Sequence, residues 1–271
     1  MKKRVGSALL LVPLTIFIFL GGMPLLLMAF VIGAMAMAEF ADGFAKIGVK
    51  TYKAVGWACL ALLYIIYAHM IRTGLPVADY QHYMLFWVFV VVAAGLLLML
   101  FTKDQNISNG PVTMLSVLYI GFFSSHVVLI DHLEQGAILV WLALLTAFGT
   151  DIFAYLIGIR FGKRKLCPAL SPKKTVEGAL GGLAGSILLC TIFGWVILPE
   201  LILHCALIGL IGSIFAQMGD LVASAFKRKM GIKDYGNLIP GHGGILDRFD
   251  SILFTLPVVY YYTTLIIYNY S

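Results

Sequence analysis

Long apolar stretches recur along the whole of this 271-residue chain and decide what it can fold into. About 20 apolar residues are needed for a helix to cross the roughly 30 Å hydrocarbon layer of a membrane. Hydrophobic residues make up 61% of the sequence, far above their share in a soluble domain. The sequence therefore predicts an all-α, polytopic membrane protein with about nine transmembrane helices, near residues 5–22, 24–41, 54–71, 84–101, 112–130, 136–158, 178–198, 201–223 and 250–268.

Basic residues are divided unevenly between the two sides that nine spans create. The net charge is +6, and of the 19 Lys and Arg residues only Arg72 falls on the side opposite the N-terminus. Because Lys and Arg concentrate in cytoplasmic loops, we expect the N-terminus to be cytoplasmic and the C-terminus to lie outside. Positive charge placed in this way suits a multi-pass cell-membrane protein beside acidic lipids, and we expect no nucleic-acid partner.

The start of the chain and its cysteines each allow a second interpretation. Lys2, Lys3 and Arg4 before an apolar run also resemble a signal peptide, but small residues suited to cleavage come only after a second apolar run. We therefore favour a retained first span. The four cysteines show no CxxC spacing, so we expect small buried hydrophobic residues and no structural zinc site.

The polar residues divide the chain, which we expect to form one integral membrane domain, into two functional parts. Residues 1–135 hold anchoring spans, where solvation at the membrane surface accounts for Glu39 and Asp42. Residues 136–271 hold the spans and cytoplasmic loops that we expect to be catalytic. At the start of one of these spans, Gly178-x-x-x-Gly182 and Gly181-x-x-x-Gly185 predict close packing against another helix.

Residue Asp220 lies on a polar face of the eighth predicted span, with Gln217 and Ser224 and near Lys227 and Arg228. Its place about seven residues before Lys227 puts it roughly 10 Å below that lysine, inside the membrane boundary. A carboxylate there needs a partner, a cation or a wet cavity. We favour a metal ligand, and an ion pair with a Lys from a neighbouring loop is the alternative.

The segment that follows is rich in glycine and charge. Three glycines and a proline in Pro240–Gly244 rule out regular helix and allow successive N–H groups to face an anion. Asp247 and Asp250 then open the last span, whose positive dipole end suits phosphate. We interpret Asp247 as a cation ligand, Asp250 equally as a ligand or a helix-start residue, and His242 as a group for phosphate or a departing oxygen.

A third polar group surrounds the sixth and seventh spans. Asp151 lies near the cytoplasmic end of the sixth span, and a basic loop follows it. Ser171 and Pro172 make a good N-cap and first helical residue, which predicts a helix start there. The same stretch supplies candidate phosphate-binding residues Ser171, Lys173, Lys174 and Thr175, and Glu177 is expected to pair with Lys173.

The region from Ser224 to Asp250 resembles the signature of the phosphatidate cytidylyltransferases, also called CDP-diglyceride synthases. The pattern is filled by Ser224, Lys227, Arg228, Lys233, Asp234, His242, Gly243, Gly244, Asp247, Arg248 and Asp250. The segments Ser171-Pro-Lys-Lys-Thr-Val-Glu-Gly178 and Gln217-x-Gly-Asp220 are also similar to that family. The likeness covers about 120 residues from residue 146 onward, whereas the earlier spans match only in hydrophobicity and length.

This resemblance implies transfer of a cytidylyl group from CTP to phosphatidate, with release of pyrophosphate. It also implies a homodimer and dependence on Mg²⁺, alone or with a second cation. We expect Asp220, Asp247 and Asp250 to bind metal, with Asp151, Lys233 and His242 as further catalytic residues. Substrate binding is expected of Ser171, Lys173, Lys174, Thr175, Ser224, Lys227, Arg228 and Arg248, at a site that faces the cytoplasm.

Other membrane proteins are weaker matches to these residues. A CTP-using lipid kinase would transfer the γ-phosphate instead of the nucleotidyl group. A CDP-alcohol phosphotransferase would need a run of aspartates at fixed spacings, which is missing. Transporters place polar groups near the middle of the bilayer and open to both sides, whereas the ionisable groups here gather at one end of the spans.

Overall fold

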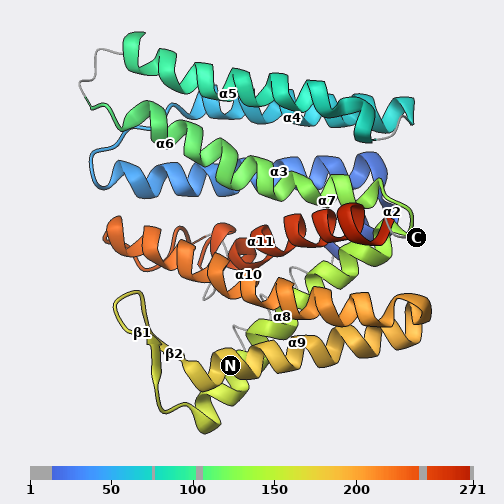
Figure 1. The fold of residues 1–271 in the computed structure, drawn as a ribbon. Helices are drawn as coiled ribbons and strands as arrows, with labels where there is room; N and C mark the ends of the chain where they lie inside the picture. The colour runs from blue at the N-terminus through green and yellow to red at the C-terminus, as the bar shows by residue number, and fades with distance from the viewer. Residues whose placement is uncertain (1–13, 75–76, 102–105, 238–242, 269–271) are drawn as a thin grey trace. The chain divides into compact units, whose positions relative to one another are not determined.

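A computed structural model describes residues 14–74, 77–101, 106–237 and 243–268, and most of these residues are helical (Figure 1). Within these residues, eight helical stretches are long and apolar enough to cross a membrane. The prediction of an all-α polytopic membrane protein is confirmed. Most of the first predicted span, residues 5–13, lies outside the described residues, and its described end is helix α2 (Leu14–Leu20).

The chain divides into two compact units. Unit 1 comprises residues 1–134 and 229–248, and unit 2 comprises residues 135–228 and 249–271. Much of the glycine-rich and charged segment before the last span therefore groups with the N-terminal helices. Besides α2, unit 1 contains α3 (Gly22–Ala45), α4 (Lys53–Thr73), the 3-10 helix η1 (Val77–Tyr80), α5 (Gln81–Phe101), α6 (Asn109–Ser116), the π-helix η2 (Val117–Phe122) and α7 (Phe123–Asp131).

Unit 2 is built on three long helices and a small β-hairpin. Its elements are α8 (Gly136–Phe161), β1 (Lys165–Cys167), β2 (Ser171–Thr175), α9 (Val176–Ile197), the 3-10 helix η3 (Pro199–Leu201), α10 (Ile202–Lys229) and the π-helix η4 (Thr263–Ile267). Helix α11 (Leu246–Tyr262) starts in unit 1 and continues into unit 2 from Phe249.

The core of unit 1 is largely apolar and aromatic, although polar residues such as Ser125 and His126 are also buried in it. Phe40, Leu60 and Trp87 are fully buried. The Trp87 indole stacks on Phe122 with ring centroids 6.0 Å apart, and its Nε1 donates a hydrogen bond to the Cys59 carbonyl oxygen at 2.7 Å. A buried indole thus keeps a hydrogen-bond partner, as a low-dielectric interior requires.

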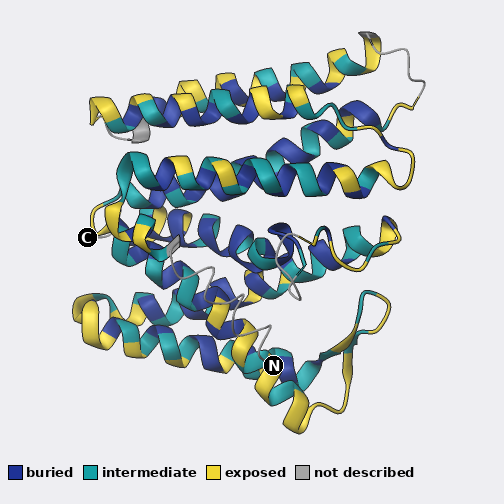
Figure 2. Cartoon of the chain, turned by 180° about the vertical axis from the view of Figure 1, so that it is seen from behind, coloured by how far each residue is buried: buried dark blue, intermediate teal, exposed yellow. Residues whose placement is uncertain are grey.

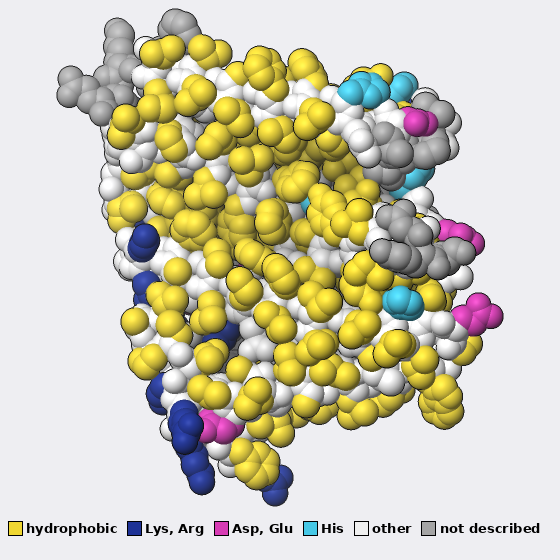
Figure 3. All heavy atoms as spheres, viewed as in Figure 1, with side chains coloured by type: hydrophobic (Ala, Val, Ile, Leu, Met, Phe, Trp, Pro, Cys, Tyr) yellow, Lys and Arg dark blue, Asp and Glu magenta, His cyan; other side chains and the backbone are white. Residues whose placement is uncertain are grey.

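Outward-facing positions carry large apolar side chains along whole helices. In α5 only 17% of the most apolar 18-residue stretch is buried. Its Leu85 and Leu100 side chains are 72% and 75% exposed. Figure 2 shows exposed positions spread along the helices, and Figure 3 shows hydrophobic side chains over most of the visible helical surface. A surface of this kind suits contact with lipid tails and not with water.

Helices α8 and α9 pack closely through the glycines that the sequence singled out. A Cβ atom at Gly178 would lie 2.8 Å from the Ala154 carbonyl oxygen, and one at Gly182 would lie 2.8 Å from that of Thr150. Any side chain there would force the backbones apart. The predicted packing role of these glycines is confirmed.

This contact gives a direct test of the fold. Gly182→Leu should lower the thermal unfolding midpoint of the detergent-purified protein, because overpacking a close interface typically costs about 1–3 kcal/mol. Ala184→Leu adds the same side chain at an exposed position of α9 and is the matched control, expected to leave the midpoint near that of the wild type. Equal midpoints for the two variants would contradict the packing.

Candidate active site

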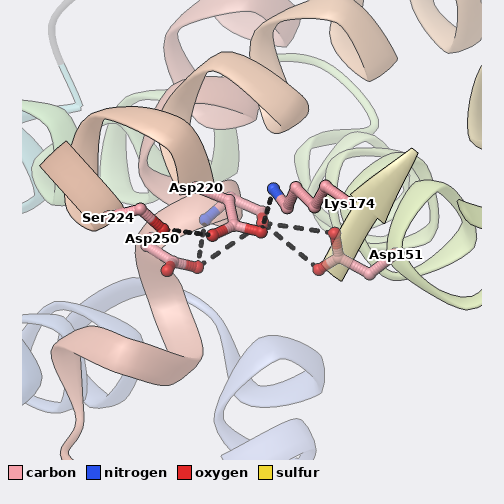
Figure 4. Close-up of polar contacts among 6 residues, drawn as sticks. Asp151, Lys174, Asp220, Ser224 and Asp250 are labelled. Atoms are coloured by element: carbon pink, nitrogen blue, oxygen red, sulfur yellow. Dashed lines mark hydrogen bonds and ion pairs between the residues drawn. The ribbon is translucent and has the colours of Figure 1, made fainter. Parts of the chain in front are cut away.

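Three carboxylates from three helices of unit 2 gather around one lysine (Figure 4). Asp151 comes from α8, Asp220 from α10 and Asp250 from α11, while Lys174 comes from β2. The Lys174 ammonium forms an ion pair with Oδ2 of Asp220, and the two side chains are 28% and 27% exposed. The pair is therefore sheltered but within reach of solvent. The alternative considered for Asp220, an ion pair with a loop lysine, is what the structure contains.

Two serines hydrogen-bond to these carboxylates, and one of them, Ser251, links α11 to Asp151 of α8. The Ser224 hydroxyl lies 3.4 Å from Oδ1 of Asp220, one helical turn away. The Ser251 hydroxyl donates to Oδ2 of Asp151 at 3.2 Å, and the Ser251 N–H donates to Oδ1 of Asp250 at 2.8 Å. Ser251 was not predicted as a site residue. Its only signal in the sequence is its position directly after Asp250.

The cluster concentrates negative charge where the interior meets solvent, since Asp250 is buried, Asp220 is half-buried and Asp151 is exposed. Asp250 is 7% exposed and interacts electrostatically with Asp220, Asp151 and Lys227. Like charges in such an environment favour a cation between them. Among the described residues, no three His, Cys, Asp or Glu side chains are arranged around a common metal position. Magnesium does not require such a set, because it usually keeps waters and takes one or two carboxylates plus substrate phosphates.

The β-hairpin replaces the helix start predicted at Ser171 and Pro172. Strands β1 and β2 pair antiparallel, with Cys167 opposite Ser171, and α9 begins only at Val176. A two-stranded hairpin tolerates Pro172 because both of its strands are edges. Thr175 is the N-cap instead, since its side chain accepts a hydrogen bond from the Gly178 N–H at 3.1 Å.

Two further polar contacts fix the ends of this hairpin. The Glu177 carboxylate accepts hydrogen bonds from the backbone N–H groups of Lys163 and Arg164, the shortest to each being 2.9 and 3.1 Å. The predicted pairing of Glu177 with Lys173 is therefore wrong. At the turn, Nε of Arg228 donates to the Leu170 carbonyl oxygen at 3.1 Å. Helix α10 thus holds the hairpin through Arg228 as well as through Asp220.

In unit 1, Asp247 organises the backbone of the segment that contains it. Its Oδ2 accepts hydrogen bonds from the N–H groups of Tyr235 at 2.8 Å and Gly244 at 3.0 Å. Gly243 adopts a φ of +84°, a conformation that favours glycine. The Gly244 N–H, which we expected to face an anion, thus donates to a carboxylate of the chain itself. The role of Asp247 as a metal ligand stays a prediction.

A second carboxylate in unit 1 was missed as a site residue. Glu39 of α3 accepts hydrogen bonds from the N–H groups of Ile245 and Leu246, each at 2.9 Å. The interpretation of Glu39 as a solvated interfacial residue is therefore wrong. These N–H groups belong to the start of α11, where the first turn of a helix leaves donors unpaired. The dipole end expected to attract phosphate carries a protein carboxylate at these two groups.

The remaining predicted site residues differ in their surroundings. Arg248 is part-buried, and its Nε is shielded from solvent without a hydrogen-bond acceptor among the described residues, which suits an anionic ligand. Lys173 and Lys233 are exposed, and Ser171 is half-buried. His242 lies outside the described residues. The structure thus brings together Asp151, Lys174, Asp220, Ser224 and Asp250, all within unit 2.

Comparison with known proteins agrees with the character of this site. A sequence model of the family described as "Cytidylyltransferase family" matches residues 2–266. The phosphatidate cytidylyltransferase of Bacillus subtilis (strain 168) is 34% identical over 266 residues, which cover 96% of this chain and 97% of that protein. The enzyme of the same name from Staphylococcus epidermidis (strain ATCC 12228 / FDA PCI 1200) is 33% identical over 270 residues, with the same two coverages.

Proposed function

The chain belongs to the cytidylyltransferase family and is a nucleotidyltransferase, and we propose that it converts CTP and phosphatidate to CDP-diacylglycerol and pyrophosphate. The relatives' names supply the two substrates. The observation that carries the proposal is the cluster of Asp151, Asp220 and Asp250 around Lys174 in a chain with many spanning helices. Carboxylates that gather a cation, beside lysines that attract phosphate, are the groups that this transfer needs.

The reaction makes one phosphorus–oxygen bond and breaks another. A phosphate oxygen of phosphatidate attacks the α-phosphorus of CTP, and the bond from that phosphorus to the bridging oxygen breaks to release pyrophosphate. The lipid phosphate is a monoester with a second pKa of about 6, so it is largely dianionic near neutral pH. No general base is required, and the main obstacle is the repulsion between two polyanions.

Charge compensation is therefore the work that the site must do. We assign the binding of Mg²⁺ to Asp220 and Asp250. Asp151 would help to position Asp250, because Ser251 hydrogen-bonds to both carboxylates. When bound, the metal would supply positive charge that offsets the repulsion between the two phosphate groups. Lys174, which pairs with Asp220, and Lys227, which interacts with Asp250, would neutralise phosphate charge nearby. Arg248 of unit 1 is, by itself, a candidate phosphate-binding residue, because its part-buried Nε has no acceptor among the described residues.

The placement of the site in the cell rests on the sequence alone. The concentration of Lys and Arg residues supports a cytoplasmic site, where CTP arrives from water while acyl chains remain in lipid. The proposed homodimer rests on the family resemblance. Neither proposal is needed for the chemistry above.

A product assay tests the proposed reaction. Purified protein with phosphatidate, Mg²⁺ and CTP labelled at the α-phosphate should place the label on lipid and release pyrophosphate. Diacylglycerol in place of phosphatidate, or chelation of Mg²⁺, should abolish both signals. Release of CDP into solution, with the γ-phosphate found on lipid, would show a lipid kinase instead and overturn the proposal.

A further inference from the structure

We propose that Glu39, far from the signature segment in sequence, is a positioning residue for the transfer reaction. Its carboxylate would hold the start of α11 and thereby orient Asp247 and Arg248. The inference rests on the proposed function only for its effect on turnover. We call the hydrogen bonds from the Ile245 and Leu246 N–H groups to Glu39 the clamp. The clamp lies within unit 1, which contains both α3 and residues 229–248.

The geometry is that of a carboxylate bound to a helix N-terminus. Oε1 of Glu39 accepts the Ile245 N–H and Oε2 accepts the Leu246 N–H, each at 2.9 Å, so both oxygens are engaged. A negative charge at the first turn of a helix is stabilised by unpaired N–H groups and by the helix dipole. The residue that performs this capping comes from a helix about 200 positions earlier in the chain.

The backbone around Glu39 is shaped to admit its carboxylate. A Cβ atom at Gly236 would lie 2.7 Å from Oε1, and one at Gly244 would come still closer to Oε2. Side chains at these two positions would displace the carboxylate. Two glycines of the segment are therefore needed for contact with Glu39, independently of any ligand.

Neighbouring residues of α3 contact the same segment. The Phe40 ring packs against Tyr235 with centroids 6.1 Å apart, and a Cβ at Gly43 would lie 2.6 Å from the Met230 sulfur. The Tyr235 N–H in turn donates to Asp247. Glu39 and Asp247 together bind the N–H groups of Tyr235, Gly244, Ile245 and Leu246, so the two carboxylates hold the backbone at Tyr235 and over residues 244–246.

Positioning predicts a specific pattern in variants of the full-length protein. Glu39→Gln keeps the shape of the side chain but loses the charge and one acceptor. Its kcat should fall about 100-fold, the scale of a 1 Å misplacement, with a much smaller change in the KM for CTP. Hydrogen–deuterium exchange of residues 243–248 should become about tenfold faster, because charge-assisted hydrogen bonds are lost. Gly236→Ala should cause a smaller loss of the same kind.

Asp42→Asn is the matched control, because Asp42 lies on the same helix but pairs with Lys53 at 2.6 Å in an exposed position. It should leave both measurements unchanged. Unaltered exchange of residues 243–248 in Glu39→Gln would overturn the clamp. Faster exchange throughout unit 1 with a lower thermal midpoint would show general stability instead of positioning. If the wild type fails to use CTP and phosphatidate while the local exchange result holds, the proposed function fails and the clamp stands.

Discussion

Asp220→Asn should reduce turnover of CTP and phosphatidate by about 1000-fold or more while the protein remains folded. A bound metal is worth several kcal/mol of transition-state stabilisation, and each 1.36 kcal/mol is a factor of ten in rate. Asparagine retains the size of the side chain and an acceptor for Ser224. It removes the charge that pairs with Lys174 and that would attract a divalent cation. The measurement is the initial rate of pyrophosphate release at saturating Mg²⁺.

The control for this variant is Glu200→Gln, which neutralises an exposed carboxylate of unit 2 in η3, outside the cluster. It should be as active as the wild type. Extraction in detergent and the thermal midpoint of Asp220→Asn should both match the control, which separates loss of chemistry from loss of fold. Turnover of Asp220→Asn within about tenfold of wild type would remove Asp220 from the reaction centre.

Asp247→Asn should also reduce turnover strongly, by about 100-fold or more, the scale expected when catalytic groups are misplaced. Both the Tyr235 and the Gly244 N–H groups donate to the same Asp247 oxygen, so Asn can still accept them through its carbonyl oxygen, but it lacks the negative charge that strengthens both hydrogen bonds. Both amides should exchange faster with deuterium. Initial rates and exchange of the peptides containing residues 235 and 244 are the two measurements, with Asp42→Asn as the active control.

A magnesium titration of Asp247→Asn distinguishes its two possible contributions. If Asp247 binds the metal, the Mg²⁺ concentration that gives half-maximal rate should rise. An unchanged Mg²⁺ requirement together with faster local exchange would restrict Asp247 to holding the backbone. Wild-type rates and wild-type exchange together would contradict both roles.

The membrane fold follows from features that a sequence displays directly. Apolar runs of spanning length become helices because hydrocarbon leaves the backbone no other hydrogen-bond partners. The close approach at Gly182 was also predictable, since spacing by four places small residues on one helix face. The β-hairpin could not be predicted in the same way, because Ser171 and Pro172 suit a helix start as well as an edge strand. Pairing with β1, a non-local contact, decides between them.

The site shows the same division between local and distant information. The signature residues and Asp151 could be predicted as site residues because charge is rare in an apolar chain. Of these, Asp151, Asp220 and Asp250 lie together in unit 2. Glu39 was missed because solvation at a membrane surface explains a lone carboxylate until its partner is known. That partner is the backbone of Ile245 and Leu246, and N–H donors have no signature in a sequence.

The docking of residues 229–248 onto the N-terminal helices has a consequence for how such chains can be recombined. A chimera joined near residue 135 would keep every signature residue yet exchange the surface of α3 on which part of the signature rests. We therefore expect substitutions at Glu39, Phe40 and Gly43 to disturb this segment, because these three residues contact it. Helix α3, which has the length and hydropathy of a membrane span, therefore also fixes the backbone conformation of the polar segment.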